Sequence, residues 1–500
     1  MIALLDTNIV IHREGIKGAS QDIGLLFKWL ERCHYQKCVH SITIEEIKKN
    51  PNKETVNTFL TKLDSYEQIE IPSPMDDSVA KISAEVDVNE NDKNDSLLLN
   101  EVYSGRVDIF ITEDKKIHRK ASRLNVSDKV FTIESFLEKA CAENPSLINY
   151  KVLNVKRVKF GELSLNDPFF DTLKNDYVGF DKWFLRKYDD MAYVTINESN
   201  KRLLSFLYLK IENSSENYTD IEPVFKPKKR LKVGTFKVIS NGFRLGERFL
   251  KIIFENAIEN DVDKIYVTAF NHDEEQRRLI DLLTQWGFVL WGKKGEELVY
   301  VRDMKREFNL QEPKLSFPYF SKNRQAFITA IYPKYHTDLL PDSILKNESD
   351  MDYAEGLAHR DSLNKVYVSR AFGEHPKHGD LLVFYRTGGF YQSVVTTICV
   401  VDEVKNDFHS VEDFKKYCKK ISVFTDQELL DMWNYRSTKP FAVKFLYNYS
   451  FPRRINMQKL IDLGILRGVD DAPRGFRPIT KNELELILKE TESDGRFIVD

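Results

Sequence analysis

The sequence predicts a multidomain α/β protein, and three observations lead to this fold class. The chain has 500 residues, which is too long for a single hydrophobic core. A typical domain size of about 150 residues suggests about three domains. Apolar residues make up 42% of the chain and charged residues 30%, as in globular proteins rather than disordered ones. Short apolar runs alternate with stretches of helical spacing, which is typical of sheets covered by helices.

The first segment, residues 1–142, alternates strands and helices most clearly. Strands are expected at IALLD, CVHSIT, VDIFIT and KVFTI, and helices at IGLLFKWLERCH, EEIKKN, TVNTFLTKLDSY, SLLLNEVY and KKIHRKASRL. This order predicts a parallel sheet with helices on its faces. Residues 143–150 are expected to form a linker.

Two further segments follow. Residues 151–304 show a second α/β pattern, which begins with the strands AYVTI, LLSFLYLKIE and LKVGTFKVI. A second linker is expected at 305–314. Residues 315–500 contain the strand runs KVYVS, DLLVFYR and SVVTTICVVDEV, and end in the helical stretches NMQKLIDLG and KNELELILKE. The chain shows no internal repeat.

Composition also limits compartment and partners. The five cysteines are scattered without CxxC spacing, which favours reduced thiols over disulfides or a zinc site. No apolar run approaches the roughly eighteen residues of a membrane span, and the N-terminal MIALLDTNIVIH lacks the basic start of a signal peptide. We therefore expect a cytoplasmic protein that does not contact membranes.

A net charge of −3 argues against capture of long nucleic acid by bulk electrostatics. Any contact with nucleic acid would have to come from local basic runs, and two stand out. One extends from Lys115 to Arg123, and the other from Lys226 to Lys232. The alternative is that each run is a solvated helix face or a charged loop.

Four carboxylates are expected at the ends of different elements of the first sheet. Asp6 ends one apolar strand run, and Asp114 follows another. Asp95 lies just before SLLLNEVY, in the first turn of a helix, and Glu46 begins the helix after SITI. Such carboxylates repel one another unless a cation neutralises them, and hard oxygen ligands suit Mg²⁺ or Mn²⁺. The pattern predicts a metal site that activates water against a phosphodiester.

Some of these assignments have alternatives. Glu45 neighbours Glu46, and Asp92 lies three residues before Asp95, so either could replace its neighbour as a metal ligand. Asp6, taken alone, could instead cap a helix or a turn.

The first segment resembles a PIN domain, the fold of toxin ribonucleases and of several RNA-processing nucleases. The matching pieces are LLDTN, the S-x-T-x-x-E stretch, NDKND before an apolar helix, and VDIFITEDKKIHRKA. The resemblance implies a parallel sheet with flanking helices, and an active site in which Asp6, Glu46, Asp95 and Asp114 bind the metal. It also implies that Thr112 belongs to this site.

The second segment resembles a GNAT acetyltransferase. A glycine-containing loop follows the strand KVGTFKVIS and leads into the amphipathic helix of GFRLGERFLKIIFENAIEND. Amides at such a helix start can bind a pyrophosphate. The resemblance implies a GNAT α/β fold that holds acetyl-CoA between splayed parallel strands. The residues expected at the cofactor are Gly242, Phe243, Arg244, Leu245, Gly246 and Glu247.

This segment departs from the GNAT pattern. When Gly246 is aligned to the last glycine, Asn241 and Arg244 occupy the first two fixed positions, and Leu283 stands where a tyrosine often acts as the general acid. Tyr300 and His272 are the remaining candidates for that acid. The alternative is a domain that binds CoA, or only a partner, without turnover.

The third segment resembles a PUA-like domain of the ASCH/EVE kind, a small β-barrel with helices. The match lies in KVYVSRAFGEHPKHGDLLVFYRTGG, in the strand after it, and in APRGFRPITKNELELIL. The resemblance implies an RNA-binding surface, for which Arg370, Tyr385 and Arg386 are the candidates. The alternative is that Tyr385 belongs to the core and the arginines are solvated.

Together these features predict a Mg²⁺- or Mn²⁺-dependent endoribonuclease whose PUA-like segment helps to select the RNA, with tRNA as one candidate. The alternative function is an N-acetyltransferase that acts on RNA, aminoacyl-tRNA or protein, with the PIN segment as an RNA-binding platform. A third hypothesis is a regulatory scaffold without turnover. Family analogy adds a toxin–antitoxin role, with an antitoxin or regulatory protein as partner, and self-association into a homo-oligomer.

Overall fold

The computed structural model describes residues 1–14, 21–143, 155–197, 200–239, 244–343, 358–371, 375–388, 393–419, 421–435 and 439–500. The chain forms two compact units, which are treated separately below. The first is Met1–Asn149 with Ile239–Gly242, and the second is Tyr150–Val238 with Phe243–Asp500. In the described ranges, no helix has the length and apolar character needed to cross a bilayer.

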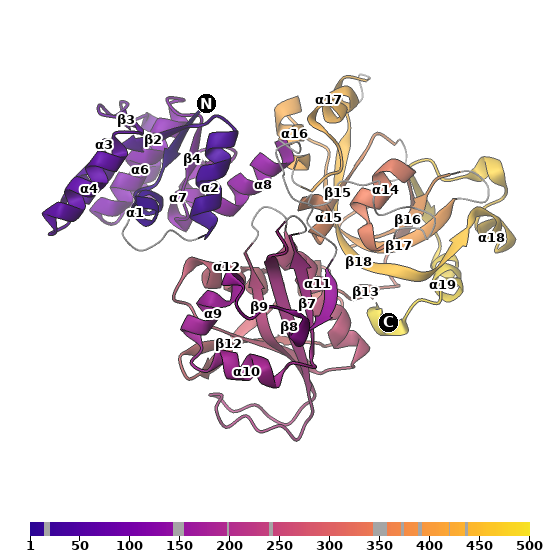
Figure 1. Ribbon diagram of the computed structural model, residues 1–500. Coiled ribbons are helices and arrows are strands. Elements are labelled where there is room, and N and C mark those ends of the chain that lie inside the picture. The colour runs from indigo at the N-terminus through magenta and orange to yellow at the C-terminus, as the bar shows by residue number, and fades with distance from the viewer. Residues whose placement is uncertain are drawn as a thin grey trace. The chain divides into compact units, whose positions relative to one another are not determined.

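The first unit contains a five-stranded, fully parallel sheet with helices packed around it (Figure 1). Its strand order is β3-β2-β1-β4-β5. The strands are β1 (Ile2–Leu5), β2 (Gln36–His40), β3 (Glu67–Ile69), β4 (Ile109–Ile111) and β5 (Val130–Phe131). The helices are α1 (Thr7–Glu14), α2 (Gln21–Arg32), α3 (Ser41–Lys48), α4 (Lys53–Leu63), α5 (Asp77–Val86), α6 (Glu90–Tyr103), α7 (Lys115–Arg123) and α8 (Ile133–Glu143). The predicted parallel sheet is confirmed.

Two helices begin earlier than the sequence predicted. The strand expected through CVHSIT ends at His40, whose ring nitrogen caps α3 by accepting from the amide of Ile42 at 3.1 Å. Glu46 therefore lies in the second turn of α3 rather than at its start. In the same way, Asn89 caps α6, so Asp95 lies in the second turn of that helix and not in the first. Capping side chains begin a helix wherever they satisfy its free amides, and here they lie upstream of the apolar runs.

A buried lysine fixes α7 to the neighbouring helices. The Lys120 ammonium group forms an ion pair with Asp87 at 2.5 Å and donates to the Asp92 carbonyl at 2.7 Å and the Ser96 hydroxyl at 2.9 Å. Only 4% of its side chain is exposed. All three donors of the ammonium group are used, so the contact locks α7 against the start of α6.

The middle part of the second unit is a seven-stranded sheet in the order β11-β12-β10-β9-β8-β7-β6. Neighbouring strands are antiparallel except for the parallel pair β9 and β10. The strands are β6 (Lys156–Lys159), β7 (Met191–Ile196), β8 (Leu203–Glu212), β9 (Arg230–Val238), β10 (Lys264–Ala269), β11 (Val289–Lys294) and β12 (Glu297–Asp303). The main helices are α9 (Asp171–Asp176), α10 (Phe180–Arg186), α11 (Leu245–Glu259) and α12 (Glu274–Gln285).

The last part is a six-stranded mixed sheet in the order β15-β18-β17-β16-β14-β19, with a separate pair of β13 and β20. The strands are β13 (Phe320–Ser321), β14 (Ala326–Ile331), β15 (Asn364–Ser369), β16 (Leu381–Arg386), β17 (Val394–Lys405), β18 (Phe441–Asn456), β19 (Phe476–Ile479) and β20 (Ile498–Val499). The helices are α13 (Pro313–Ser316), α14 (Pro333–Leu339), α15 (Ala358–Asp361), α16 (Val411–Cys418), α17 (Asp426–Asn434), α18 (Met457–Asp462) and α19 (Lys481–Glu490).

The barrel expected in this last part is not closed. β15 pairs with β18, and β19 pairs with β14, but no pairing joins β15 to β19 among the described strands. β17 and β18 lose register at three places, and such bulges bend a sheet strongly. The result is a curved open sheet rather than a barrel with all its edges paired.

The middle and last parts of the second unit share one hydrophobic core, which extends from Leu207 to Phe497. Arg302 of β12 helps to join them: its buried guanidinium donates to the carbonyl oxygens of Leu315 at 2.8 Å and Phe317 at 2.7 Å. Burial lowers the pKa of Arg302 to about 10. The two parts are one compact unit, and the boundaries predicted between them remain a prediction.

Replacing Lys120 by Met should destabilise the first unit by about 3–5 kcal/mol, because the substitution leaves the buried Asp87 carboxylate without its cation. Arg123→Ala is the matched control on the same helix: Arg123 pairs with Glu85 at the surface, and such a pair contributes less than about 1 kcal/mol. Hydrogen exchange of α6 and α7 in the full chain at increasing urea concentrations measures the loss of stability in both variants. Equal losses in the two variants would contradict the role given to Lys120.

Candidate active site

The ends of β1 and β4 meet at one edge of the first sheet. Asp6 follows β1, and its amide donates to the Ile111 carbonyl at 3.1 Å. The Thr112 hydroxyl, fully buried after β4, donates to the Asp6 carboxylate at 2.5 Å. The same hydroxyl accepts from the Asp114 amide at 3.0 Å. Thr112 thus holds Asp6 and Asp114 on either side of one hydrogen-bonded junction.

Asp114 also has a local structural role. It is the N-cap of α7, and its carboxylate accepts from the Lys116 amide at 2.6 Å. A capping carboxylate keeps its second oxygen available, so this role does not exclude a place in the site. The predicted position of Asp114, just after a buried strand, is the one observed.

Asp95 approaches this edge from α6. Its pKa is raised to about 7, mainly by burial and then by the charges of Asp114 and Asp6, while Lys120 acts in the opposite direction. Burial also raises the pKa of Asp6. The hydrogen bond from Thr112 lowers this pKa, whereas the charges of Asp114 and Glu46 raise it further. These effects indicate that Asp114 and Glu46 lie within electrostatic reach of Asp6, and that Asp6 and Asp114 lie within reach of Asp95.

The structure distinguishes between the alternatives left open by the sequence. Glu46 is half-buried and accepts from the Asn94 side chain at 3.3 Å, whereas Glu45 is exposed. Asp92 forms an ion pair with Lys116 at 2.6 Å, and the bond from Lys116 is the main cause of its lowered pKa. These contacts favour Glu46 and Asp95, whose role as metal ligands remains a prediction.

A metal site would have to be assembled from these carboxylates. The part of the chain that the structure describes holds no group of three His, Cys, Asp or Glu side chains already arranged around one ion. The nearest lysines pair elsewhere, Lys116 with Asp92 and Lys120 with Asp87. The carboxylates of Asp6 and Asp95 fit a hard cation in charge and in donor type.

Both basic runs have structural partners. Arg230, in the second run, is buried against the rings of Tyr218 and Phe225. In the first run, three cations pair with carboxylates before or at the start of α6: Lys116 with Asp92, Lys120 with Asp87, and Arg123 with Glu85. For these residues the structure favours a role in the fold over a role in binding nucleic acid.

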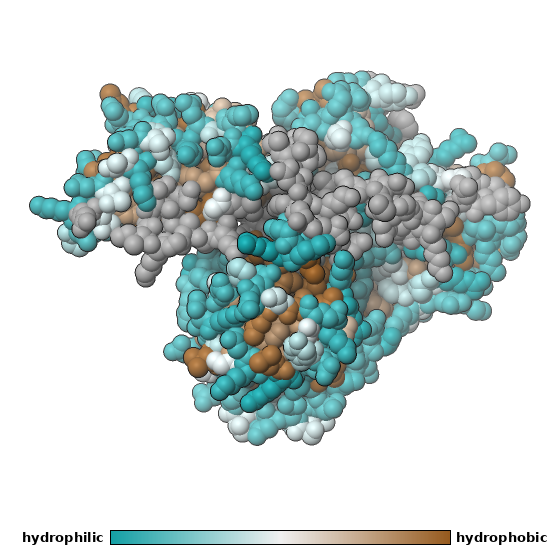
Figure 2. Space-filling model, viewed as in Figure 1, coloured by the Kyte–Doolittle hydropathy of each residue, from teal (hydrophilic) through white to brown (hydrophobic). Residues whose placement is uncertain are grey.

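A second candidate site lies where β9 and β10 separate. The two strands pair from Arg230 to Val233 of β9, but β9 continues to Val238. The separation begins at Gly234, a bulge in the pairing with β8, where a Cβ atom would overlap the Tyr208 ring. Figure 2 shows apolar surface over this region of β7, β8 and β9. Beyond Val233, the β10 side of β9 has no strand partner among the described residues.

The first turn of α11 is engaged by the last part of the unit. The Glu247 carboxylate accepts from the Leu363 amide at 2.7 Å and the Ser362 hydroxyl at 3.1 Å, and it pairs with Arg244. Burial works against ionisation of Glu247, but Arg244 and these donors outweigh it and hold its pKa below the ordinary value. A buried anion in this turn repels a pyrophosphate and already interacts with the positive end of the helix dipole.

The other residues predicted at the cofactor have mixed positions. Leu245 is buried, and a Cβ atom at Gly246 would overlap the Leu282 side chain of α12. Gly246 therefore allows two helices to pack closely. Gly242 and Phe243 lie outside the described residues. The cofactor role of this loop remains a prediction.

The candidates for a general acid lie apart from one another. His272 is exposed and stacks on Phe270 at 5.0 Å. Tyr300 is buried on β12, and burial raises its pKa. Leu283 belongs to the core, so its position offers no polar group.

In the last part, the residues predicted to bind RNA have different surroundings. Tyr385 is 1% exposed and belongs to the shared core, so a base cannot stack on it in this structure. Arg386 is nearly buried at the end of β16. Arg370 lies over the Tyr435 ring at 5.4 Å. The alternative that Tyr385 is a core residue is confirmed, and RNA binding by the two arginines remains a prediction.

Sequence reasoning missed two residues that position the first site. Asn94 contacts Glu46, and its place beside Asp95 in NDKND was the available signal. Lys120 was grouped with the basic run, but helical spacing places it on the same face of α7 as the buried Ile117 and Ala121. That spacing predicts a buried lysine, which requires an anionic partner.

No family model matches the chain, and no curated protein matches it. The chain is similar to a solved ASCH structure from Zymomonas mobilis, at 11% identity and a TM-score of 0.25 over 33% of this chain and 96% of that one. It is similar to the NatC complex bound to Gag peptide and CoA, at 11% identity and a TM-score of 0.22 over 31% of this chain and 100% of that one. A third similar structure is Arabidopsis thaliana NAA60 in complex with acetyl-CoA, at 12% identity and a TM-score of 0.21 over 30% of this chain and 99% of that one. None of the three is named as a PIN-domain protein.

The Asp95 carboxyl should titrate with a midpoint near pH 7 when divalent cations are absent, as followed by carboxyl-carbon NMR. The folded carboxyl then keeps a proton between about pH 4 and pH 7 that the unfolded chain has lost, so stability of the metal-free unit falls as the pH rises through this range. Asp6→Asn should lower the Asp95 midpoint, because it removes a neighbouring negative charge. A midpoint near the ordinary value of about 4 would contradict the proximity of these carboxylates.

Proposed function

We propose that the first unit is a divalent-cation-dependent ribonuclease. The observation that carries this proposal is the Thr112 junction, which holds Asp6 and Asp114 together at the carboxyl edge of a parallel sheet. The raised pKa of Asp95, to which the charges of both aspartates contribute, supports its place in the same group. Three carboxylates gathered from different elements raise the free energy of the unit unless a proton or a cation compensates them. Ligands of open α/β sheets also bind at this edge.

The chain's own residues would divide the work at this site. Asp6, Asp95 and Asp114 would hold the ion, and Glu46 would complete the set from α3. Mg²⁺ or Mn²⁺, when bound, would supply a Lewis acid and lower the pKa of a water molecule. Thr112 would keep the Asp6 carboxylate oriented through its 2.5 Å bond, and Asn94 would orient Glu46 in the same way.

RNA is the substrate that the PIN resemblance implies. The surroundings of the site add no strong field, because the nearest cations on α7 already pair with carboxylates. Binding of a long polyanion would therefore be weak and sensitive to salt. A small set of contacts close to the cleaved bond, including those through the metal, would have to position the strand.

Cleavage of labelled single-stranded RNA should require Mn²⁺ or Mg²⁺ and stop with EDTA. Asp6→Asn and Asp95→Asn should each lower the cleavage rate at least about 100-fold, because each removes a charged oxygen ligand. Glu45→Gln is the matched control, since Glu45 is an exposed neighbour of the site and its loss should leave the rate unchanged.

Manganese binding to the same variants separates folding from chemistry. Calorimetry should detect Mn²⁺ binding to the wild-type chain and to Glu45→Gln, but not to Asp6→Asn. Metal-dependent cleavage that survives both aspartate substitutions would remove the site. Cleavage of a DNA strand of matched sequence at an equal rate would overturn RNA as the substrate.

A second candidate function is acetyl-CoA-dependent acyl transfer by the middle part of the second unit. It is favoured by the separation of β9 from β10 after Val233, which leaves one side of Thr235–Val238 without a strand partner in the described part of the chain. Unpaired strand groups can bind an extended ligand that carries amides, and the pantetheine arm of CoA is such a ligand. The buried Glu247 in the first turn of α11 weighs against a pyrophosphate at that turn.

Acetyl-CoA should slow hydrogen exchange in Thr235–Val238, while Arg230–Val233, which already pairs with β10, should not change. Calorimetry with acetyl-CoA on the full chain measures whether it binds at all, and release of free CoA with candidate amines measures turnover. Protection confined to other segments, or no binding at about 1 mM, the weak end of specific affinity, would rule out this edge of β9 as the cofactor site.

A further inference from the structure

His378 binds two carbonyl oxygens at once. It lies in the turn before β16, and its Nδ1 atom is 2.5 Å from the Asp402 carbonyl oxygen. Its Nε2 atom is 2.6 Å from the carbonyl oxygen of Leu310. Leu310 belongs to the connector, defined here as residues 304–312 between β12 and α13. The ring therefore joins the connector to β17.

The two acceptors determine the charge of the ring. A carbonyl oxygen has no hydrogen to donate, so each ring nitrogen must carry one. Neutral imidazole has a single N–H, and only the imidazolium form has two. In this geometry, only the imidazolium form could donate to both carbonyl oxygens. In the neutral form, a bare nitrogen lone pair would face an oxygen across one of these short distances.

The base of this contact is rigid. The Gly379 amide donates to the Val401 carbonyl at 2.8 Å, and the Val401 amide donates back to Asp380 at 2.8 Å. Leu310 packs so closely on Gly379 that a Cβ atom there would overlap its side chain. Gly379 also has a φ of +80°, which favours glycine. The turn is thus fixed to β17, and Leu310 of the connector packs against it.

Nearby charged groups are already paired or point to other partners. The Asp402 carboxylate pairs with Lys444 of β18 at 3.1 Å, and Asp380 pairs with Arg324 at 3.3 Å. Glu403 accepts from the Tyr417 hydroxyl at 2.9 Å. Lys377 of the turn and Lys314 of α13 are the remaining cations close to these groups. Among the described residues, no carboxylate bonds to the His378 ring.

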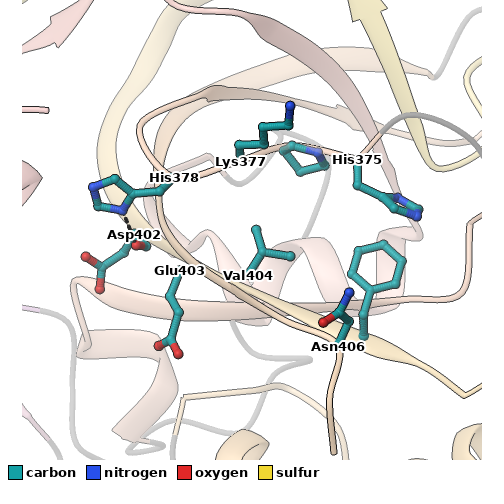
Figure 3. A pocket seen from close by; sticks show the side chains of 9 residues that line it. His375, Lys377, His378, Asp402, Glu403, Val404 and Asn406 are labelled. Carbon is teal, nitrogen blue, oxygen red and sulfur yellow. Dashed lines mark hydrogen bonds between the residues drawn. The ribbon is translucent and has the colours of Figure 1, made fainter. Parts of the chain in front are cut away.

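The same ring lines a cavity. His378 and Asp402 form one wall of a pocket of about 690 Å³, with Lys377, Glu403 and Asn406 also at its surface. Figure 3 shows His378 beside Asp402, with the bond between them marked. A change at His378 would therefore alter both the connector and this wall.

We propose that His378 is a pH-dependent clasp, whose imidazolium form ties the connector to β17 and whose neutral form releases one of the two bonds. The clasp is closed at lower pH and opens as the pH rises, because loss of one proton removes one donor. Histidine is the side chain that changes charge in this way near neutral pH.

Hydrogen exchange of the full chain tests the clasp. Protection of the connector, corrected for intrinsic rates, should fall about tenfold between about pH 5.5 and pH 8, as expected for the loss of one charge-assisted bond. His378→Arg, which stays cationic and can donate to both carbonyls, should keep the connector protected at both pH values. His378→Gln should leave the connector unprotected at both pH values. His409→Gln, at another exposed histidine, should behave as wild type.

Nitrogen NMR of the labelled imidazole gives a second readout that does not depend on any variant. At about pH 5.5 both His378 nitrogens should show N–H signals with slowed exchange. Connector protection that is unchanged by pH in the wild-type chain would overturn the proposal. So would a His378→Arg variant with the same pH dependence as wild type, because another group would then be responsible.

Discussion

The hydrogen bond from the Thr112 hydroxyl to the Asp6 carboxylate is the interaction on which the first site depends. It crosses between the ends of two paired parallel strands and joins residues 106 positions apart. Because β1 and β4 are in register, Asp6 and Asp114 leave the sheet at the same edge. That bond, together with one from the Asn8 amide, satisfies the buried Asp6 carboxylate, because burying an unsatisfied charge is costly. The fold thus keeps its acidic groups together even though they repel one another.

In the second unit, buried polar contacts of helix α11 have a comparable structural role. Its first turn carries the buried Glu247, which is bonded to Leu363 and Ser362 beyond the connector. Arg248, the next residue, and Lys251, one turn further on, both pair with Asp342. A helix that the sequence pattern associates with a cofactor therefore also carries the ionic contacts between the middle and last parts. Any ligand that moves this helix will act on both parts.

The parallel sheet and the residues at its edge could be predicted, because strand ends and apolar runs are local features of sequence. Asp6, Thr112 and Asp114 lie where their strands stop, as expected. The helix starts at His40 and Asn89 were missed, since a capping side chain determines them and not the apolar pattern. The partners of Glu247 and Tyr385 depend on contacts more than a hundred residues away or on burial in a shared core. No local pattern contains that information.

The shared core of the second unit has an evolutionary consequence. Two segments that read as separable modules cannot be exchanged one at a time, because Arg302 would lose the carbonyl groups of Leu315 and Phe317, and apolar side chains of both parts would meet water. Recombination that moves either segment into another gene would yield a chain prone to aggregate. We expect the pair to be inherited together and substitutions on one side of their contact to be matched on the other.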